Sequence, residues 1–214
     1  MRKTRYLRLS IIALIVGLIV FVAVPGPASA QLPLPGTGTT SSQVIGSAAA
    51  LQATVLGTTT ALASTGSLGN GGADELGADA VDASIPSVGS AEAPRAATGG
   101  EGDPVDTISS DASLGNLALT VEGFAISADF VMAQALAMLG TAPVGWSELD
   151  NLTVNGVSIV PTGAANQTIS LGAITLVLNE VQQTATGITV NALHITSLDG
   201  LVDVVVASAT AGIQ

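Results

Sequence analysis

Short stretches in the second half of the chain alternate between apolar and polar residues. Residues 117–122 read Leu-Ala-Leu-Thr-Val-Glu, and residues 124–130 continue the same period of two after Gly123. A period of two puts every second side chain on one face of a strand, so these stretches predict strands with one buried face and a bend at Gly123. Residues 132–139, mostly Ala, Leu and Met, fit either a continuation of the strand or a short helix.

The strongest turn signal is Asn155-Gly156, which separates two alternating runs within residues 152–159. This dipeptide accepts the two positive φ angles of a type I′ turn and therefore predicts a β-hairpin. Asp199-Gly200 is a second turn signal, and the Val-rich run 201–207 after it fits a strand buried on both faces. Short strands at roughly ten-residue spacing predict an all-β fold, a β-sandwich of short antiparallel strands after an N-terminal signal helix.

A single β domain is expected over residues 43–214. Small apolar and β-branched residues predict a strand in residues 43–56 and, more weakly, another in residues 74–88. Residues 57–73 are rich in Thr, Ser and Gly, which is typical of a loop. Residues 89–110 contain Pro and Gly but few large apolar side chains, and they predict a long loop.

The first thirty residues have the three parts of a secretory signal peptide. A basic start is followed by the apolar stretch 11–24, by a Pro-Gly-Pro break and by the small residues Ala-Ser-Ala that end at Ala30. Residues 1–30 are therefore expected to be removed, and residues 31–42, mostly Pro, Gly, Thr and Ser, to form a flexible lead-in. The alternative is an uncleaved anchor, in which residues 11–24 would keep the protein at a membrane.

The charges after the signal segment have almost a single sign. One basic residue, Arg95, stands against sixteen carboxylates, which gives a net charge of −15 and leaves no Lys. Such a surface offers no cations to phosphate groups, so nucleic acids and anionic lipid headgroups are excluded as partners. Metal cations and basic polymers fit this charge, and the partner is otherwise unknown from the sequence.

The composition also excludes much catalytic chemistry. The absence of Cys excludes thiol nucleophiles and disulfides, and the single His excludes a zinc site built on several imidazoles. We therefore expect no catalytic residues and no cofactor. His194 is expected on a strand face; the alternative is a Ser-His-Asp triad with Asp199 or Asp203 as the orienting carboxylate.

Four carboxylates are weak candidates for a metal site. Asp74, Glu75, Asp79 and Asp82 lie close together in the sequence and could offer hard oxygen ligands to Ca²⁺. The alternative, which we prefer, is a solvated acidic edge that prevents pairing between strands of different molecules.

Trp146 is a weak candidate for a ligand contact. It is expected in a loop, beside Pro143, Gly145 and Glu148, where an indole could stack on a sugar or a peptide. The alternative is that it covers one end of the core. A hydrolase that uses two carboxylates is the least favoured possibility, because few aromatic residues are present to hold a sugar.

Four blocks of the C-terminal half occur together in a characteristic order. They are Leu152-Thr-Val-Asn-Gly156, Leu176-Val-Leu-Asn-Glu180, Ile188-Thr-Val-Asn-Ala-Leu-His-Ile195 and Asp203-Val-Val-Val-Ala-Ser208. With these blocks the chain resembles the choice-of-anchor P family of secreted bacterial proteins, closely over residues 110–212 and loosely over residues 43–90. The resemblance implies an exported envelope or surface protein and supplies no catalytic residue.

The sequence as a whole predicts a secreted or cell-surface protein. We expect a non-catalytic β domain with a structural or surface-interaction role in the cell envelope or extracellular matrix. The alternative is a module that binds a glycan or calcium, based on Trp146 and the four carboxylates of residues 74–82.

Overall fold

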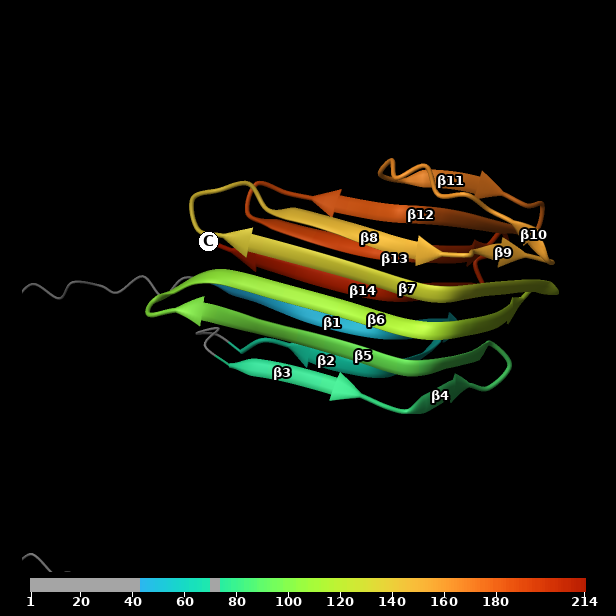
Figure 1. Ribbon diagram of the computed structural model, residues 1–214, viewed down its shortest axis with the longest axis horizontal. Coiled ribbons are helices and arrows are strands. Elements are labelled where there is room, and N and C mark those ends of the chain that lie inside the picture. Colours follow the sequence, from blue (N-terminus) through green and yellow to red (C-terminus); the bar gives the residue numbers. More distant parts are fainter. Residues whose placement is uncertain (1–42, 70–73) are drawn as a thin grey trace, which may run out of the picture. The chain divides into compact units, whose positions relative to one another are not determined.

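The computed structural model describes residues 43–69 and 74–214. The expected signal peptide, residues 1–30, and the expected lead-in, residues 31–42, lie outside the described residues. The described part is all-β, with two antiparallel sheets packed against each other (Figure 1), so the predicted fold class is confirmed. No helix that could cross a membrane is found in this part of the chain.

One sheet has six strands in the order β11-β12-β13-β14-β1-β2. It combines the start of the described chain with its last third, because β1 pairs with both β14 and β2. Its strands are β1 (Val44–Val55), β2 (Thr58–Ser67), β11 (Gln167–Ser170), β12 (Ile174–Gln183), β13 (Gly187–Ser197) and β14 (Val202–Ile213).

The other sheet has eight strands and contains the middle of the chain. Its main order is β10-β9-β7-β6-β5-β3, with β4 also paired to β5 and β8 also paired to β7. Its strands are β3 (Glu75–Asp79), β4 (Asp82–Ile85), β5 (Gly89–Gly102), β6 (Val105–Val121), β7 (Phe124–Met138), β8 (Val144–Asp150), β9 (Thr153–Val154) and β10 (Val157–Ser158).

The predicted long loop at residues 89–110 is wrong. These residues form β5 and the first part of β6, which pair with each other. The inward positions of β5 are occupied by small residues such as Ala91, Ala96 and Thr98, all of which are buried. The sequence shows no alternation of large apolar side chains here because small side chains pack this side of the core. β2 also lies where a loop was predicted; its residues are exposed or half-buried at the edge of the six-stranded sheet, so they show no buried apolar face.

Most of the predicted turns are confirmed. Asn155 and Gly156 have φ angles of 50° and 75° and connect β9 to β10. Gly200, with φ of 71°, lies in the turn between β13 and β14. The bend expected at Gly123 is a tight turn instead, in which Glu122 and Gly123 connect β6 to β7. Residues 132–139 continue β7 to Met138 and are not helical.

Several long strands carry an extra residue that interrupts the period of two. In β6 the buried side chains step by three from Leu114 to Leu117, and in β13 they step from Val190 to Leu193. In the six-stranded sheet, the pairs β12–β13, β13–β14 and β14–β1 each keep the same register before and after the extra residue. The extra residues therefore lie side by side in one row, which we call the bulge row: Asn179, Ala192, Ala207 and Ala50.

Three of the four members of the bulge row are buried alanines. Ala50, Ala192 and Ala207 are fully buried. Ala207 has a φ of 51°, a left-handed conformation that is unfavourable for a β-branched side chain. Both the backbone and the packing therefore restrict the residue at this position.

We expect Ala207→Val to lower the free energy of unfolding by about 2–4 kcal/mol, because it adds backbone strain and overfills the core. Urea denaturation of the purified protein measures this change. Ala125→Val, at an exposed position of β7, is the matched control and should stay within about 0.5 kcal/mol of wild type. Equal effects of both substitutions would contradict the tight packing of the row.

A buried hydroxyl connects the two sheets. Ser110 Oγ in β6 donates a hydrogen bond of 2.7 Å to the Thr210 carbonyl in β14, and it lies 2.6 Å from Thr98 Oγ1 in β5. Thr98 and Ser110 are both 2% exposed. The hydroxyl group thus makes a directional contact between sheets that otherwise pack through apolar side chains.

Ser110→Ala should destabilise the fold by about 1–3 kcal/mol, because it leaves the Thr210 carbonyl without this donor in a buried place. Thermal or urea unfolding of Ser110→Ala and of the exposed neighbour Ser109→Ala gives the comparison. A Ser110→Ala variant as stable as Ser109→Ala would show that the contact between the sheets contributes no stability.

Candidate functional site

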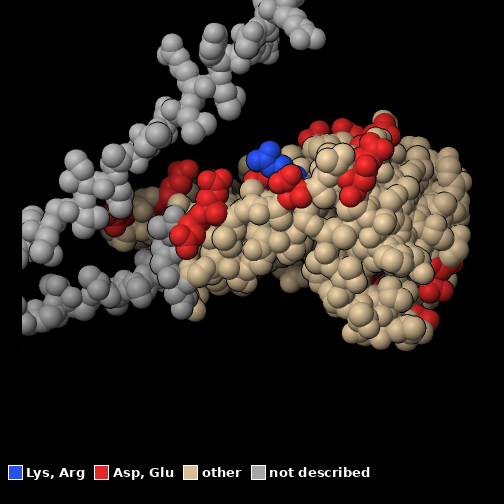
Figure 2. Space-filling view, turned by 90° about the horizontal axis from the view of Figure 1, so that it is seen from below, with Lys and Arg blue, Asp and Glu red and all other residues tan. Residues whose placement is uncertain are grey.

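The two sheets differ strongly in charge. Thirteen of the sixteen carboxylates lie between Asp74 and Asp150, within the strands and turns of the eight-stranded sheet. Figure 2 shows most of the red carboxylates along one side of the described residues, near the blue Arg, with a smaller group at one end of the opposite side. The outer face of the eight-stranded sheet is therefore the surface that a charged partner would meet first.

Trp146 belongs to this outer face. It lies in β8 and is 49% exposed. A Cβ atom added to the preceding residue, Gly145, would come within 2.5 Å of Val190 in the other sheet, so Gly145 faces inward and Trp146 faces outward. The same hairpin carries further exposed apolar residues, Val144 next to Trp146 on the same face of β8 and Met138 and Leu139 toward the turn. Trp146 is thus a strand residue on an open surface and does not cover the end of the core.

Pairing between strands places polar groups in line with Trp146. Trp146 is opposite Gln134 in β7, Gln134 is opposite Asp111 in β6, and Asp111 is opposite Ala97 in β5. We call Trp146, Gln134 and Asp111 the tryptophan row. Neighbouring strands are about 4.8 Å apart, so the row brings an indole, an amide and a carboxylate to successive positions across the sheet.

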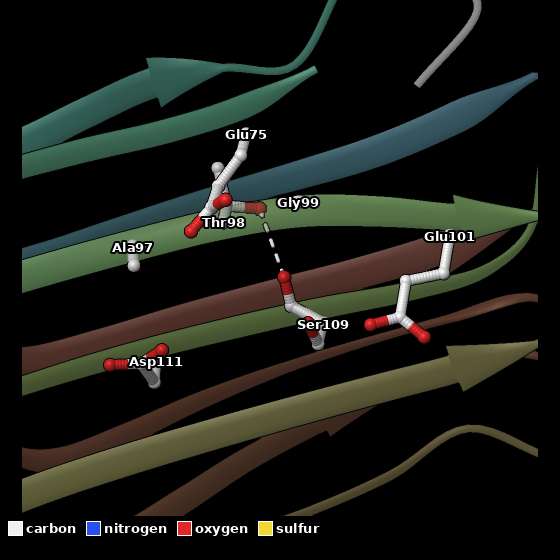
Figure 3. Close-up of a pocket in the computed structure, with 7 residues that line it drawn as sticks. All are labelled: Glu75, Ala97, Thr98, Gly99, Glu101, Ser109 and Asp111. Atoms are coloured by element: carbon white, nitrogen blue, oxygen red, sulfur yellow. Dashed lines mark hydrogen bonds between the residues drawn. The ribbon is translucent and has the colours of Figure 1, made fainter. Parts of the chain in front are cut away.

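The row leads into a shallow hollow. Figure 3 shows the carboxylates of Glu75, Glu101 and Asp111 around a floor that includes Ala97 and Gly99. The volume of this hollow is about 190 Å³. Small floor residues leave space above β5, while the carboxylates provide hydrogen-bond acceptors with negative charge at the rim of the hollow.

The four candidate calcium ligands are spread along an edge of this sheet. Asp74, Glu75 and Asp79 lie at and along β3, and Asp82 begins β4. Glu75 and Asp79 are four residues apart on one strand, a distance of about 13 Å. Among the described residues no three carboxylate or imidazole groups gather closely enough to hold a metal ion. Of the four, Glu75 lines the hollow.

A second polar cluster lies on the six-stranded sheet, around the single histidine. His194 Nδ1 is 2.9 Å from Glu180 Oε2, and His194 Nε2 is 3.0 Å from Asp203 Oδ2. Asn191 Nδ2 donates a 2.6 Å hydrogen bond to the same Glu180 oxygen. Because the three charged groups come from β12, β13 and β14, the cluster connects three neighbouring strands through their side chains.

The contacts of His194 distinguish between the two roles expected for it, a residue on a strand face and a member of a catalytic triad. His194 lies on a strand face, as predicted, and of the two candidate orienting residues it is Asp203 that contacts it. Both imidazole nitrogens face carboxylates, so neither is bonded to a serine hydroxyl as a catalytic triad requires. Asp199 accepts hydrogen bonds from Ser197 Oγ and the Leu201 amide instead, and these bonds lower the pKa of its carboxyl group.

The carboxylates control the protonation of the histidine. Burial alone would lower the pKa of His194, but the hydrogen bond to Asp203 and the negative charge of Glu180 outweigh it, so the pKa is raised above the ordinary value of 6.5. The folded protein therefore holds the imidazolium form, which pairs with both carboxylates, to a higher pH than the unfolded chain does.

This raised pKa predicts a stability that depends on pH. The contribution of His194 should be fully present below about pH 6.5, where the unfolded chain is also protonated, and should be lost as the pH rises through the folded pKa. In urea titrations, His194→Gln should cost about 1.5 kcal/mol at acidic pH and progressively less at alkaline pH. A difference between the two proteins that stays constant with pH would contradict the prediction.

No protein-family model, curated protein or solved structure matches the chain. The resemblance to the choice-of-anchor P family stays a prediction from sequence blocks, and the functional argument depends on the geometry of the described residues.

Proposed function

We propose that the protein is an exported, non-catalytic β-sandwich domain that binds other molecules at the cell surface or in the extracellular matrix. The observation that carries this proposal is the outer face of the eight-stranded sheet, where a half-exposed Trp146 and its apolar neighbours lie next to most of the carboxylates. Contiguous exposed apolar patches with a polar rim mark interaction surfaces, and Val144 and Trp146 lie next to each other on the outward side of β8.

A role in binding rather than catalysis is supported by how the polar groups are arranged. The hollow beside the tryptophan row is shallow and open, and its carboxylates stand around a floor of small residues. The histidine is held between two carboxylates on the other sheet, far along the chain from the tryptophan row. These arrangements favour contact with a partner over attack on a substrate.

Export is supported by the N-terminal signal pattern and by the resemblance to a family of secreted proteins. The expected result is a protein in the medium or the envelope fraction with an intact mass that begins at Gln31. Ala30→Leu, which removes the small residue before the cleavage point, should leave the full-length mass. A full-length wild-type protein in the cytosol would contradict export.

The interaction surface is tested with Trp146→Ala. Co-sedimentation of the purified protein with envelopes of the cells that produce it should fall about fivefold in this variant, because an exposed indole contributes most of the apolar contact. The matched control is Leu198→Ala, at a 72% exposed residue beyond the end of β13 in the other sheet. Equal retention of wild type and both variants would contradict a role for this face.

A further inference from the structure

We infer that the tryptophan row binds an oligosaccharide with free amino groups, a hexosamine chain that lies across β8, β7 and β6. The inference rests on the proposed function and narrows it to one class of ligand. It depends on three properties of the face: how its backbone is used, how its side chains are spaced, and which charge it carries.

The backbone of this face is already used by the sheet. β6 pairs with β5 on one side and β7 on the other, and β7 pairs with β6 and β8. A peptide strand therefore cannot add to these central strands through main-chain hydrogen bonds. β8 pairs only with β7, so its outer edge is the one main-chain edge among these three strands. A ligand that lies across the face of the three strands meets their side chains, which provide one exposed indole, an amide and several carboxylates. Flat rings with hydroxyl and ammonium donors match this set of groups.

The indole is the stacking surface. Trp146 is half exposed, and Val144 and Leu136 lie opposite each other in the next row of the same face. A pyranose ring presents a face of C–H groups that packs against an aromatic ring, and its hydroxyl groups point outward from the ring edge. One sugar ring on Trp146 would thus cover exposed apolar surface and leave its polar groups free.

The spacing of the row matches successive rings. From Trp146 to Gln134 and from Gln134 to Asp111 the step is one strand, about 4.8 Å, which is close to the repeat of an extended hexose chain. Three successive rings would then meet the indole, the amide and the carboxylate in turn. Beyond Asp111 the hollow over Ala97 and Gly99 leaves room for the chain to continue.

The charge of the face selects the amino form of the sugar. Asp111, Glu101 and Glu75 surround the hollow, and Glu148 follows Trp146 in β8. A hexosamine ammonium group pairs with these carboxylates, whereas an acidic polysaccharide is repelled by them and a neutral one gains only hydrogen bonds. Arg95 is the one Arg or Lys among the described residues, and it lies one row away, opposite Ser113.

The test is calorimetric titration of the purified protein with a glucosamine hexamer, at mildly acidic pH and physiological salt. Trp146→Ala and Asp111→Asn should each weaken binding about tenfold, since each removes one contact of the row. Asp82→Asn removes the same charge from β4, away from the row, and should bind within about twofold of wild type. Trp146→Phe keeps an aromatic ring and should retain most of the affinity. This result would show that the loss in Trp146→Ala comes from the missing aromatic ring and not from a disturbed fold.

Each other outcome overturns the inference in a defined way. Equal binding of the N-acetylglucosamine hexamer would overturn the requirement for free amines. Equal binding of a lysine hexapeptide, unaffected by Trp146→Ala, would show general attraction of cations and overturn the row as the site. Lack of binding by the glucosamine hexamer would overturn the inference, while the co-sedimentation experiment would still decide the proposed function separately.

Discussion

The extra residue in several long strands decides which side chains share a face. Asn191 and His194 are three residues apart, yet both hydrogen-bond to the same oxygen of Glu180. In a regular strand, residues three apart point to opposite faces of the sheet. They meet because Ala192 lies between them in the bulge row, next to Asn179 in the neighbouring strand. The histidine cluster and the inward side chains on both sides of the row therefore depend on one backbone feature.

The residues at this feature are mostly alanine in one sheet and asparagine in the other. In the six-stranded sheet the row contains three buried alanines together with Asn179, which has a φ of 49°. In the eight-stranded sheet, Asn116 and Asn151 have φ angles of 45° and 52° and donate hydrogen bonds to Glu92 and Asp129. Asn tolerates left-handed backbone and also binds a neighbouring carboxylate. The same irregularity thus positions acidic groups on the charged sheet and keeps the other sheet tightly packed.

The sequence predicted the features that depend on local pattern. Alternation in residues 117–122 and the Asn155-Gly156 turn led to the correct fold class, because strand faces and tight turns follow from neighbouring residues. The prediction of a loop at residues 89–110 was wrong because Ala91 and Ala96 form part of the core without large side chains. Trp146 was singled out as a possible ligand contact, but its partners Gln134 and Asp111 were not, because only the register between strands places them in line.

That register also fixes the positions of the side chains at which we propose a ligand site on β6, β7 and β8. The three strands follow one another in the chain and pair as two consecutive hairpins, so two turns fix the position of all three members of the row. Residues on one face of paired strands keep their spacing as long as the pairing holds. The six-stranded sheet, whose β1 and β14 come from opposite ends of the described chain, supplies the packing behind this surface through Val190 and the Ser110–Thr210 contact. Substitutions in the bulge row of β14 should therefore weaken the fold as a whole, whereas substitutions at Trp146 and Asp111 should alter binding and leave the sandwich intact.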